Sequence, residues 1–96
     1  MSAGEYSLYI VRCADGSLYT GIALDVRRRL EEHRGGTRGA KYLRGRLPVE
    51  LVFEFAAGDR SEALRLEHRV KRMSKGDKES LIVGRLALQA SGDSSG

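Results

Sequence analysis

Residues 8–21 read LYIVRCADGSLYTG, and this stretch decides the fold. Two runs rich in β-branched and aromatic residues flank the dipeptide Asp15-Gly16, a strong hairpin signal because both residues tolerate positive φ. We therefore predict two antiparallel strands, over residues 6–12 and 17–22. Together they supply two neighbouring strands of a sheet.

The hairpin carries one tyrosine on each strand, Tyr9 and Tyr19. Alternate residues of a strand share a face, so Tyr9 lies on the same face as Val11, and Tyr19 lies on the same face as Gly21. Taken singly, such tyrosines are most often packing residues whose hydroxyl finds a partner. A hairpin has no need of two phenols beside its turn, however, so the pair is also a candidate for a site.

A short helix is predicted over residues 26–33, with Asp25 as its N-cap. Its inner face is defined by residues spaced at i, i+4 and i+7, namely Val26, Leu30 and His33. Arg29 belongs to the same side. We expect the other charged residues of the helix to point elsewhere, namely Arg27, Arg28, Glu31 and Glu32. An arginine and a histidine on the core-facing side are not what solvation alone would select.

A third strand is predicted after Pro48, in the run PVELVFEF over residues 48–55. Its apolar residues alternate and define one packed face, namely Val49, Leu51, Phe53 and Phe55. Asp59 and Glu62 form a capping box at the start of a helix over residues 60–73. That helix has an apolar stripe with 3, 4, 3 spacing, namely Ala63, Leu66, Val70 and Met73.

A final helix is expected over roughly residues 75–90, capped by Ser74 and Asp77. The polar tail over residues 91–96 is expected to be disordered. The elements together predict one α+β domain over residues 1–90, with a small three-stranded antiparallel sheet flanked by about three helices.

The chain has 96 residues, enough for one domain with a small core. It carries 17 Lys and Arg against 13 Asp and Glu, for a formal net charge of +4. Eight of the cations but only two acids fall between residues 27 and 46. That concentration is what a phosphate-binding surface requires, and it favours an anionic partner such as nucleic acid.

The location of the protein follows from what the chain lacks. No apolar run approaches the ~20 residues that span a bilayer, and no signal peptide is evident. The single cysteine, Cys13, allows no internal disulfide, which fits a reducing compartment. We therefore expect a cytoplasmic protein without a membrane partner, with Cys13 buried as a small hydrophobe.

Two familiar kinds of site are excluded. The segment GGTRGAKY over residues 35–42 departs from the P-loop pattern G-x-x-x-x-G-K-[ST], because its glycines are misplaced and tyrosine follows the lysine. A structural zinc site needs four closely spaced nitrogen or sulfur ligands. The chain has one cysteine and two histidines, with no C-x-x-C or H-E-x-x-H motif.

Two charged residues allow alternative interpretations. Glu67 is either a rim carboxylate paired with Lys71 at i+4, or a carboxylate at the edge of the core that binds Mg²⁺. That ion takes one or two protein carboxylates and completes its shell with water and phosphate. In a structural role, Arg29 is a snorkelling arginine or a partner for a carboxylate. In a functional role, its guanidinium is a planar fork that binds phosphoryl oxygens.

The two strand motifs resemble those of the GIY-YIG nuclease family. SLY over residues 7–9 stands where the family has G-I-Y, and YTG over residues 19–21 stands where it has Y-I-G. The resemblance covers about residues 5–85. The segment GAKYLRGRLPVELV, residues 39–52, further resembles the small stand-alone bacterial members and the nuclease subunit of a eukaryotic structure-specific endonuclease.

The helices extend the resemblance. DVRRRLEEH over residues 25–33 is similar to the family's helix, with Arg29 at the invariant arginine and His33 at the secondary His or Tyr position. EALRLEHRVK over residues 62–71 resembles the helix that bears the metal-binding glutamate, which maps to Glu67.

The resemblance implies a metal-dependent endonuclease that hydrolyses phosphodiester bonds in DNA, at branched, damaged or single-stranded sites. It implies that Glu67 holds Mg²⁺ or Mn²⁺ and that Arg29 offsets the phosphoryl charge. Tyr9 would act as general base or orient the attacking water, and Tyr19 and His33 would bind phosphate or position the nucleophile. Free tyrosine has a pKa of about 10, so Arg29, the metal and His33 would have to favour the Tyr9 phenolate.

The resemblance also implies where the nucleic acid lies. Gly21 leaves room for close backbone approach. The glycine-rich basic loop over residues 34–46 would bind phosphates without reading sequence. Its cations are Arg34, Arg38, Lys41, Arg44 and Arg46.

Two other functions remain open. Many nucleases of the family carry an asparagine after the glutamate helix, and the corresponding segment RMSKGDKES, residues 72–80, contains none. The chain is therefore alternatively a nucleic-acid-binding module of the same fold that cleaves weakly or not at all. A third interpretation is an adaptor whose basic loop meets an acidic protein partner. The sequence does not distinguish DNA from RNA and does not set the oligomeric state.

Overall fold

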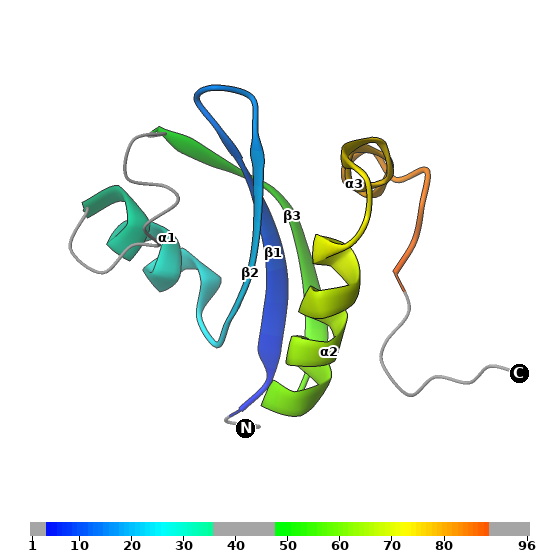
Figure 1. The fold of residues 1–96 in the computed structure, drawn as a ribbon. Helices are drawn as coiled ribbons and strands as arrows, with labels where there is room; N and C mark the ends of the chain where they lie inside the picture. Colours follow the sequence, from blue (N-terminus) through cyan, green and yellow to red (C-terminus); the bar gives the residue numbers. More distant parts are fainter. Residues whose placement is uncertain (1–3, 36–47, 89–96) are drawn as a thin grey trace, which may run out of the picture.

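The computed structural model describes residues 4–35 and 48–88, and Figure 1 shows their arrangement. An antiparallel sheet has the strand order β2-β1-β3 and consists of β1 (Tyr6–Cys13), β2 (Leu18–Ala23) and β3 (Val49–Gly58). Three helices flank it, α1 (Val26–Gly35), α2 (Arg60–Lys71) and α3 (Lys75–Ile82). The prediction of an α+β fold with a three-stranded antiparallel sheet is confirmed. The tail over residues 91–96 lies outside the described residues.

The hairpin between β1 and β2 forms as predicted. Gly16 takes a positive φ of 86°, and its N–H donates to the Cys13 carbonyl at 2.9 Å. The Asp15 carboxylate accepts from the Ser17 N–H at 3.0 Å. The turn fixes the register, which places Tyr9 opposite Gly21.

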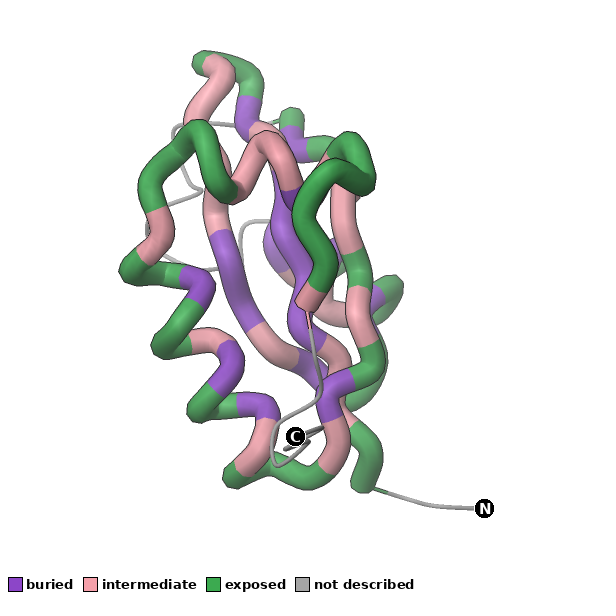
Figure 2. Tube along the Cα trace, turned by 90° about the vertical axis from the view of Figure 1, so that its right-hand side faces the viewer, coloured by how far each residue is buried: buried purple, intermediate pink, exposed green. Residues whose placement is uncertain are grey.

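The helices cover the two faces of the sheet separately. On one face, α1 packs on a cluster that includes Tyr9 and Val11. On the other, α2 packs on a cluster that includes Leu8 and Ile10. Figure 2 shows buried segments along the strands and along the inward side of α2, whose outer side is exposed. Alternate residues of β1 therefore belong to two small cores, one on each face of the sheet.

The helix caps agree with the sequence. In α1, the Asp25 carboxylate accepts from the Arg28 N–H at 3.1 Å. In α2, Asp59 and Glu62 form the predicted capping box, with both reciprocal hydrogen bonds present. Such caps satisfy N–H groups that have no partner within the helix.

The prediction for the third strand is corrected in one respect: its apolar residues do not share one face. The pairing with β1 shifts between Ile10 and Val11, which is where a β-bulge inserts an extra residue and reverses the alternation. Leu51 therefore packs with the α1-side cluster, whereas Phe53 and Phe55 pack with the α2-side cluster.

The final helix is shorter than predicted. It ends at Ile82 rather than near residue 90, because Val83 is its C-cap and Gly84 follows with a φ of +83°. A glycine in this conformation is a common helix terminator.

Two side chains hold α3 to the hairpin. Arg12 makes a bidentate ion pair with Glu79 at 2.7 and 2.8 Å, and Lys75 donates to the Gly16 carbonyl at 3.1 Å.

Two further expectations concern burial and membranes. Cys13 is a free thiol and is buried, as expected for a small hydrophobe. Over residues 4–35 and 48–88, no helix has the length and apolar character needed to cross a bilayer.

Candidate active site

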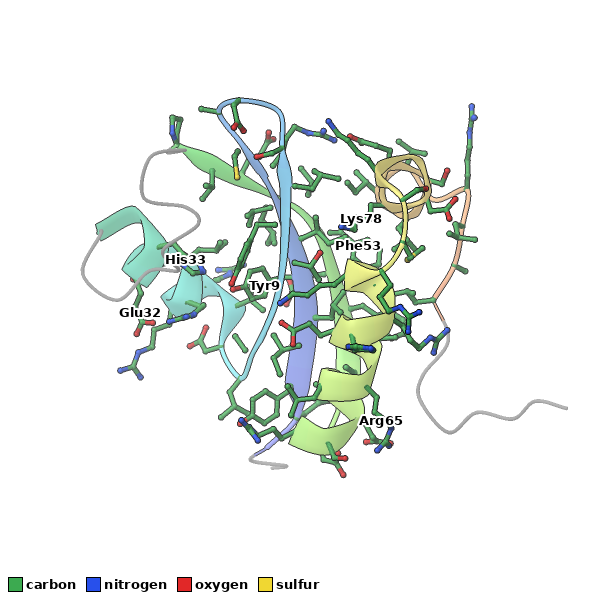
Figure 3. All side chains as sticks on the ribbon, in the orientation of Figure 1. Tyr9, Glu32, His33, Phe53, Arg65 and Lys78 are labelled. Carbon is green, nitrogen blue, oxygen red and sulfur yellow. The ribbon has the colours of Figure 1, made fainter. Side chains whose placement is uncertain are left out.

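Four residues from three elements meet on the α1 side of the sheet: Tyr9, Tyr19, Arg29 and His33. The rings of Tyr9 and Tyr19 have centroids 6.5 Å apart, and those of Tyr19 and His33 lie edge to face at 5.9 Å. Figure 3 shows Tyr9 and His33 directed toward each other between the sheet and α1. The strand and helix periods explain this meeting, because Tyr9 and Tyr19 share a sheet face and His33 lies on the inner face of α1.

The Tyr9 hydroxyl is the centre of this cluster. Its oxygen lies 3.0 Å from His33 Nε2 in a buried hydrogen bond, and the Arg29 side chain also hydrogen-bonds to it. A guanidinium has only donors, so Arg29 donates to the phenol oxygen. In the His33 tautomer that leaves Nε2 unprotonated, the phenol O–H donates to Nε2.

The pKa values of the cluster decide the charge states of Tyr9 and His33. Burial raises the pKa of Tyr9 to about 12, Tyr19 and Glu67 add to the increase, and Arg29 opposes it. Burial and the Arg29 charge lower the pKa of His33 below its ordinary value. Both groups are therefore neutral at pH 7. His33 thus adds no positive charge that would favour a Tyr9 phenolate, contrary to the expectation from the sequence.

Glu32 holds Arg29 in place, although we expected it to point elsewhere. Its carboxylate accepts from Arg29 Nη1 at 2.9 Å, and this hydrogen bond is the main reason why the pKa of Arg29 is raised. The signal in the sequence is the i,i+3 spacing, which allows such pairs on a helix. The same spacing permits several other pairs in α1, so it did not identify this one.

Gly21 accommodates the Tyr9 ring. A Cβ at this position would lie 2.6 Å from the Tyr9 hydroxyl oxygen and 2.7 Å from its Cζ. Tyr9 is only 1% exposed, so its ring has little room to move. The tyrosine therefore fills the space that glycine leaves, whereas the resemblance implied that this space admits the nucleic acid.

We expect Gly21→Ala to destabilise the fold by about 1–3 kcal/mol, because the new methyl group overpacks the site and displaces Tyr9. Urea unfolding should show a lower midpoint at an unchanged m-value. Gly76→Ala is the matched control, since a Cβ there would approach only Ser74 Oγ, at 3.8 Å. A Gly21→Ala protein as stable as this control would show that the close fit is not needed.

Glu67 approaches the cluster from the other side of the sheet. It lies on α2, with its side chain 18% exposed and paired with Lys71 Nζ at 3.2 Å. Its charge contributes to the raised pKa of Tyr9. The ion pair with Lys71 agrees with the interpretation of Glu67 as a rim carboxylate paired at i+4. The influence on Tyr9 brings Glu67 into the electrostatic surroundings of the site.

Similarity to known proteins identifies the family of this chain. Residues 5–79 match the GIY-YIG catalytic domain. The chain belongs to the GIY-YIG family. The family is a nuclease superfamily with nucleic-acid substrates, and its nucleases generally use divalent metal ions.

Close relatives of this GIY-YIG protein are small bacterial proteins. A UPF0213 protein of Cronobacter sakazakii is 52% identical over 86 residues, covering 90% of each chain. One of Yersinia pestis is 54% identical over 83 residues, covering 86% of each. Two structures solved by NMR in solution are similar. The UPF0213 protein from Bacillus halodurans has a TM-score of 0.54 at 44% identity, over 84% of this chain and 85% of that one. A protein from E. faecalis has a TM-score of 0.58 at 34% identity, over 88% and 91%.

The remaining residues that the GIY-YIG resemblance implied as nucleic-acid contacts are not placed. Their side chains lie outside the described residues: Arg34, Arg38, Lys41, Arg44 and Arg46. Their assignment to phosphate binding stays a prediction.

Proposed function

We propose that this protein is a metal-dependent endonuclease of the cytoplasm that hydrolyses phosphodiester bonds in DNA, at branched, damaged or single-stranded sites. One observation carries the proposal: the buried Tyr9 hydroxyl is held between Arg29 and the Nε2 of a neutral His33, 3.0 Å away. A phenol in this setting can accept one proton while it releases another.

The proton path removes the need for a free phenolate. As water attacks the phosphorus and the bond from phosphorus to the leaving oxygen breaks, the Tyr9 oxygen takes a proton from that water and passes its own proton to His33 Nε2. The leaving oxygen takes a proton from solvent. A phenolate formed in advance would be costly, because the pKa of Tyr9 is about 12. His33 can receive the proton in the tautomer that leaves Nε2 unprotonated, and its lowered pKa keeps the imidazole neutral at neutral pH. His33 is thus a proton acceptor, a role more specific than positioning.

Arg29 neutralises the charge that gathers on the phosphoryl oxygens. Its guanidinium is a planar fork that matches them, and Glu32 holds it beside Tyr9. A donor that is already in position stabilises a transition state without reorganising. Tyr19 lies next to Tyr9 in the cluster, where its hydroxyl can bind the same phosphate.

Glu67 is the residue proposed to hold Mg²⁺ or Mn²⁺. Within the described ranges, no three His, Cys, Asp or Glu side chains are grouped so that they could hold a metal ion. A single half-buried carboxylate still suits Mg²⁺, which keeps several waters and takes further oxygens from substrate phosphate. When bound, the ion supplies positive charge that polarises the phosphoryl oxygens. The Lys71 pair is of a weak i,i+4 type that a cation can replace.

The second candidate is a module that binds nucleic acid without cutting it. The observation that favours it is the Glu67–Lys71 pair, which satisfies the proposed metal ligand from within the protein. Such a module would bind DNA in a salt-dependent manner and show no turnover with any metal.

The test is cleavage of labelled branched, nicked and single-stranded DNAs and RNAs with Mg²⁺ or Mn²⁺. We expect cleavage of at least one DNA, abolished by chelation and by Glu67→Ala. Glu54→Ala is the matched control, since Glu54 is an exposed carboxylate on β3. Salt-dependent binding without cleavage would favour the binding module, and cleavage that survives Glu67→Ala would remove Glu67 from the site.

A further inference from the structure

A pocket of about 260 Å³ opens at the end of β2, next to the candidate active site. Apolar walls come from Tyr6, Ile22 and Leu24, and Arg28 and Arg29 are the cations that line it. Leu24 is 57% exposed, so the fold does not require it for a core. We refer to this hollow as the β2 pocket.

The β2 pocket lies close to the Tyr9 hydroxyl, about two residues farther along β2. Ala23 lines it and shares a face of β2 with Gly21, two residues earlier, which corresponds to about 6.6 Å along a strand. The Tyr9 ring lies against Gly21, and Arg29 both bonds to Tyr9 and lines the pocket. A phosphate bound at Arg29 would therefore bring the neighbouring nucleotide to the pocket.

The charges around the β2 pocket select which part of a nucleotide can enter it. Asp25 and Glu32 also line it, and two carboxylates disfavour a phosphate inside. Arg28 attracts a phosphate outside, because its side chain is 77% exposed. The neutral part of a nucleotide is its base, whose flat face stacks well on aromatic and apolar side chains.

We infer that the β2 pocket receives one unpaired base of the strand that is cut, on a nucleotide next to the scissile phosphate. The inference rests on the proposed function, which places that phosphate at Arg29. A base within a duplex is stacked and paired, and it must leave the helix before it can enter a protein pocket. The substrate class is therefore a strand with an unpaired nucleotide beside the cut, as in a single strand, a flap or a mismatch.

The experiment substitutes one base at a time. The cut is mapped on single-stranded or flap DNA, and an abasic nucleotide is then placed at each position around it. At one position next to the cut, the abasic substrate should lower kcat/KM roughly 5- to 100-fold, the range expected for one stacked base. Leu24→Ala should lower kcat/KM on the intact substrate and reduce the abasic effect at that position. Leu64→Ala is the matched control, at a leucine on α2 that is 38% exposed. It should change neither kcat/KM on the intact substrate nor the abasic effect.

A binding measurement separates this inference from the proposed function. The fluorescence of 2-aminopurine at the same position should be quenched when wild-type protein binds the oligonucleotide, and Leu24→Ala should reduce the quenching. Cleavage with no position-specific abasic effect and no quenching would overturn the pocket while leaving the nuclease. Quenching that depends on Leu24, without cleavage of any substrate, would support the pocket and overturn the nuclease. Quenching unaffected by Leu24→Ala would also overturn the pocket.

Discussion

Tyr9→Phe is expected to slow phosphodiester cleavage by about 10²- to 10⁴-fold, the range for loss of a group that transfers a proton in the transition state. Phenylalanine keeps the ring that fills the space at Gly21, so the fold and substrate binding should change little. Single-turnover cleavage with saturating enzyme measures the chemical step. A measurement of DNA affinity and of the unfolding midpoint shows whether binding and folding are kept.

The pH dependence tests the same proton path. Because cleavage needs neutral His33, the wild-type rate should be flat above the lowered pKa of His33 and fall as the pH drops through it, below 6.5. In His33→Ala the phenolate itself must act, and its pKa of about 12 predicts a rate that rises tenfold per pH unit through the neutral range. A wild-type rate with that slope from pH 7 to 10 would show that His33 does not take the proton.

Arg29→Ala is expected to reduce the rate of cleavage about 10²- to 10³-fold, since it removes a fixed donor for the phosphoryl oxygens. Arg29→Lys should restore only part of this loss, because an ammonium lacks the planar fork. The measurement is kcat on the best substrate at saturating metal. Arg85→Ala removes an exposed arginine after α3 and is the control for net charge. An equal loss in both variants would mean that Arg29 acts only through long-range attraction of DNA.

The parts of the fold that could be predicted depend on neighbours in the sequence. The turn at Gly16, the cap at Asp59 and the alternation of β1 are each decided within a few residues, and the structure has all three. The two errors have other causes. The bulge in β3 arises from pairing with Ile10 and Val11, far away in the chain. The early end of α3 depends on the backbone at Gly84, which an apolar pattern does not show.

The candidate site also has features that the sequence predicts and features that depend on packing. That Tyr9 and Tyr19 share a face, and that His33 turns inward, follows from the strand and helix periods. The hydrogen bond between Tyr9 and His33 and the fit of the Tyr9 ring over Gly21 depend on how α1 packs on the sheet. The lowered pKa of His33 depends on the burial that results. Periodicity therefore indicated which side chains meet, and packing decides what they do to one another.

The middle position of β1 has a consequence for synthesis. Strand β1 leaves the ribosome before β2 and β3, and its pairing with β2 is possible once Ala23 has emerged. Its other partner, β3, ends at Gly58, 35 residues later, or about 2–7 s at roughly 5–20 residues per second. During that interval one edge of β1 has no strand beside it, and α2 has not yet been made to cover Leu8. Unpaired edges invite association with other chains. A nascent chain halted in this window should therefore be held by a chaperone rather than fold alone.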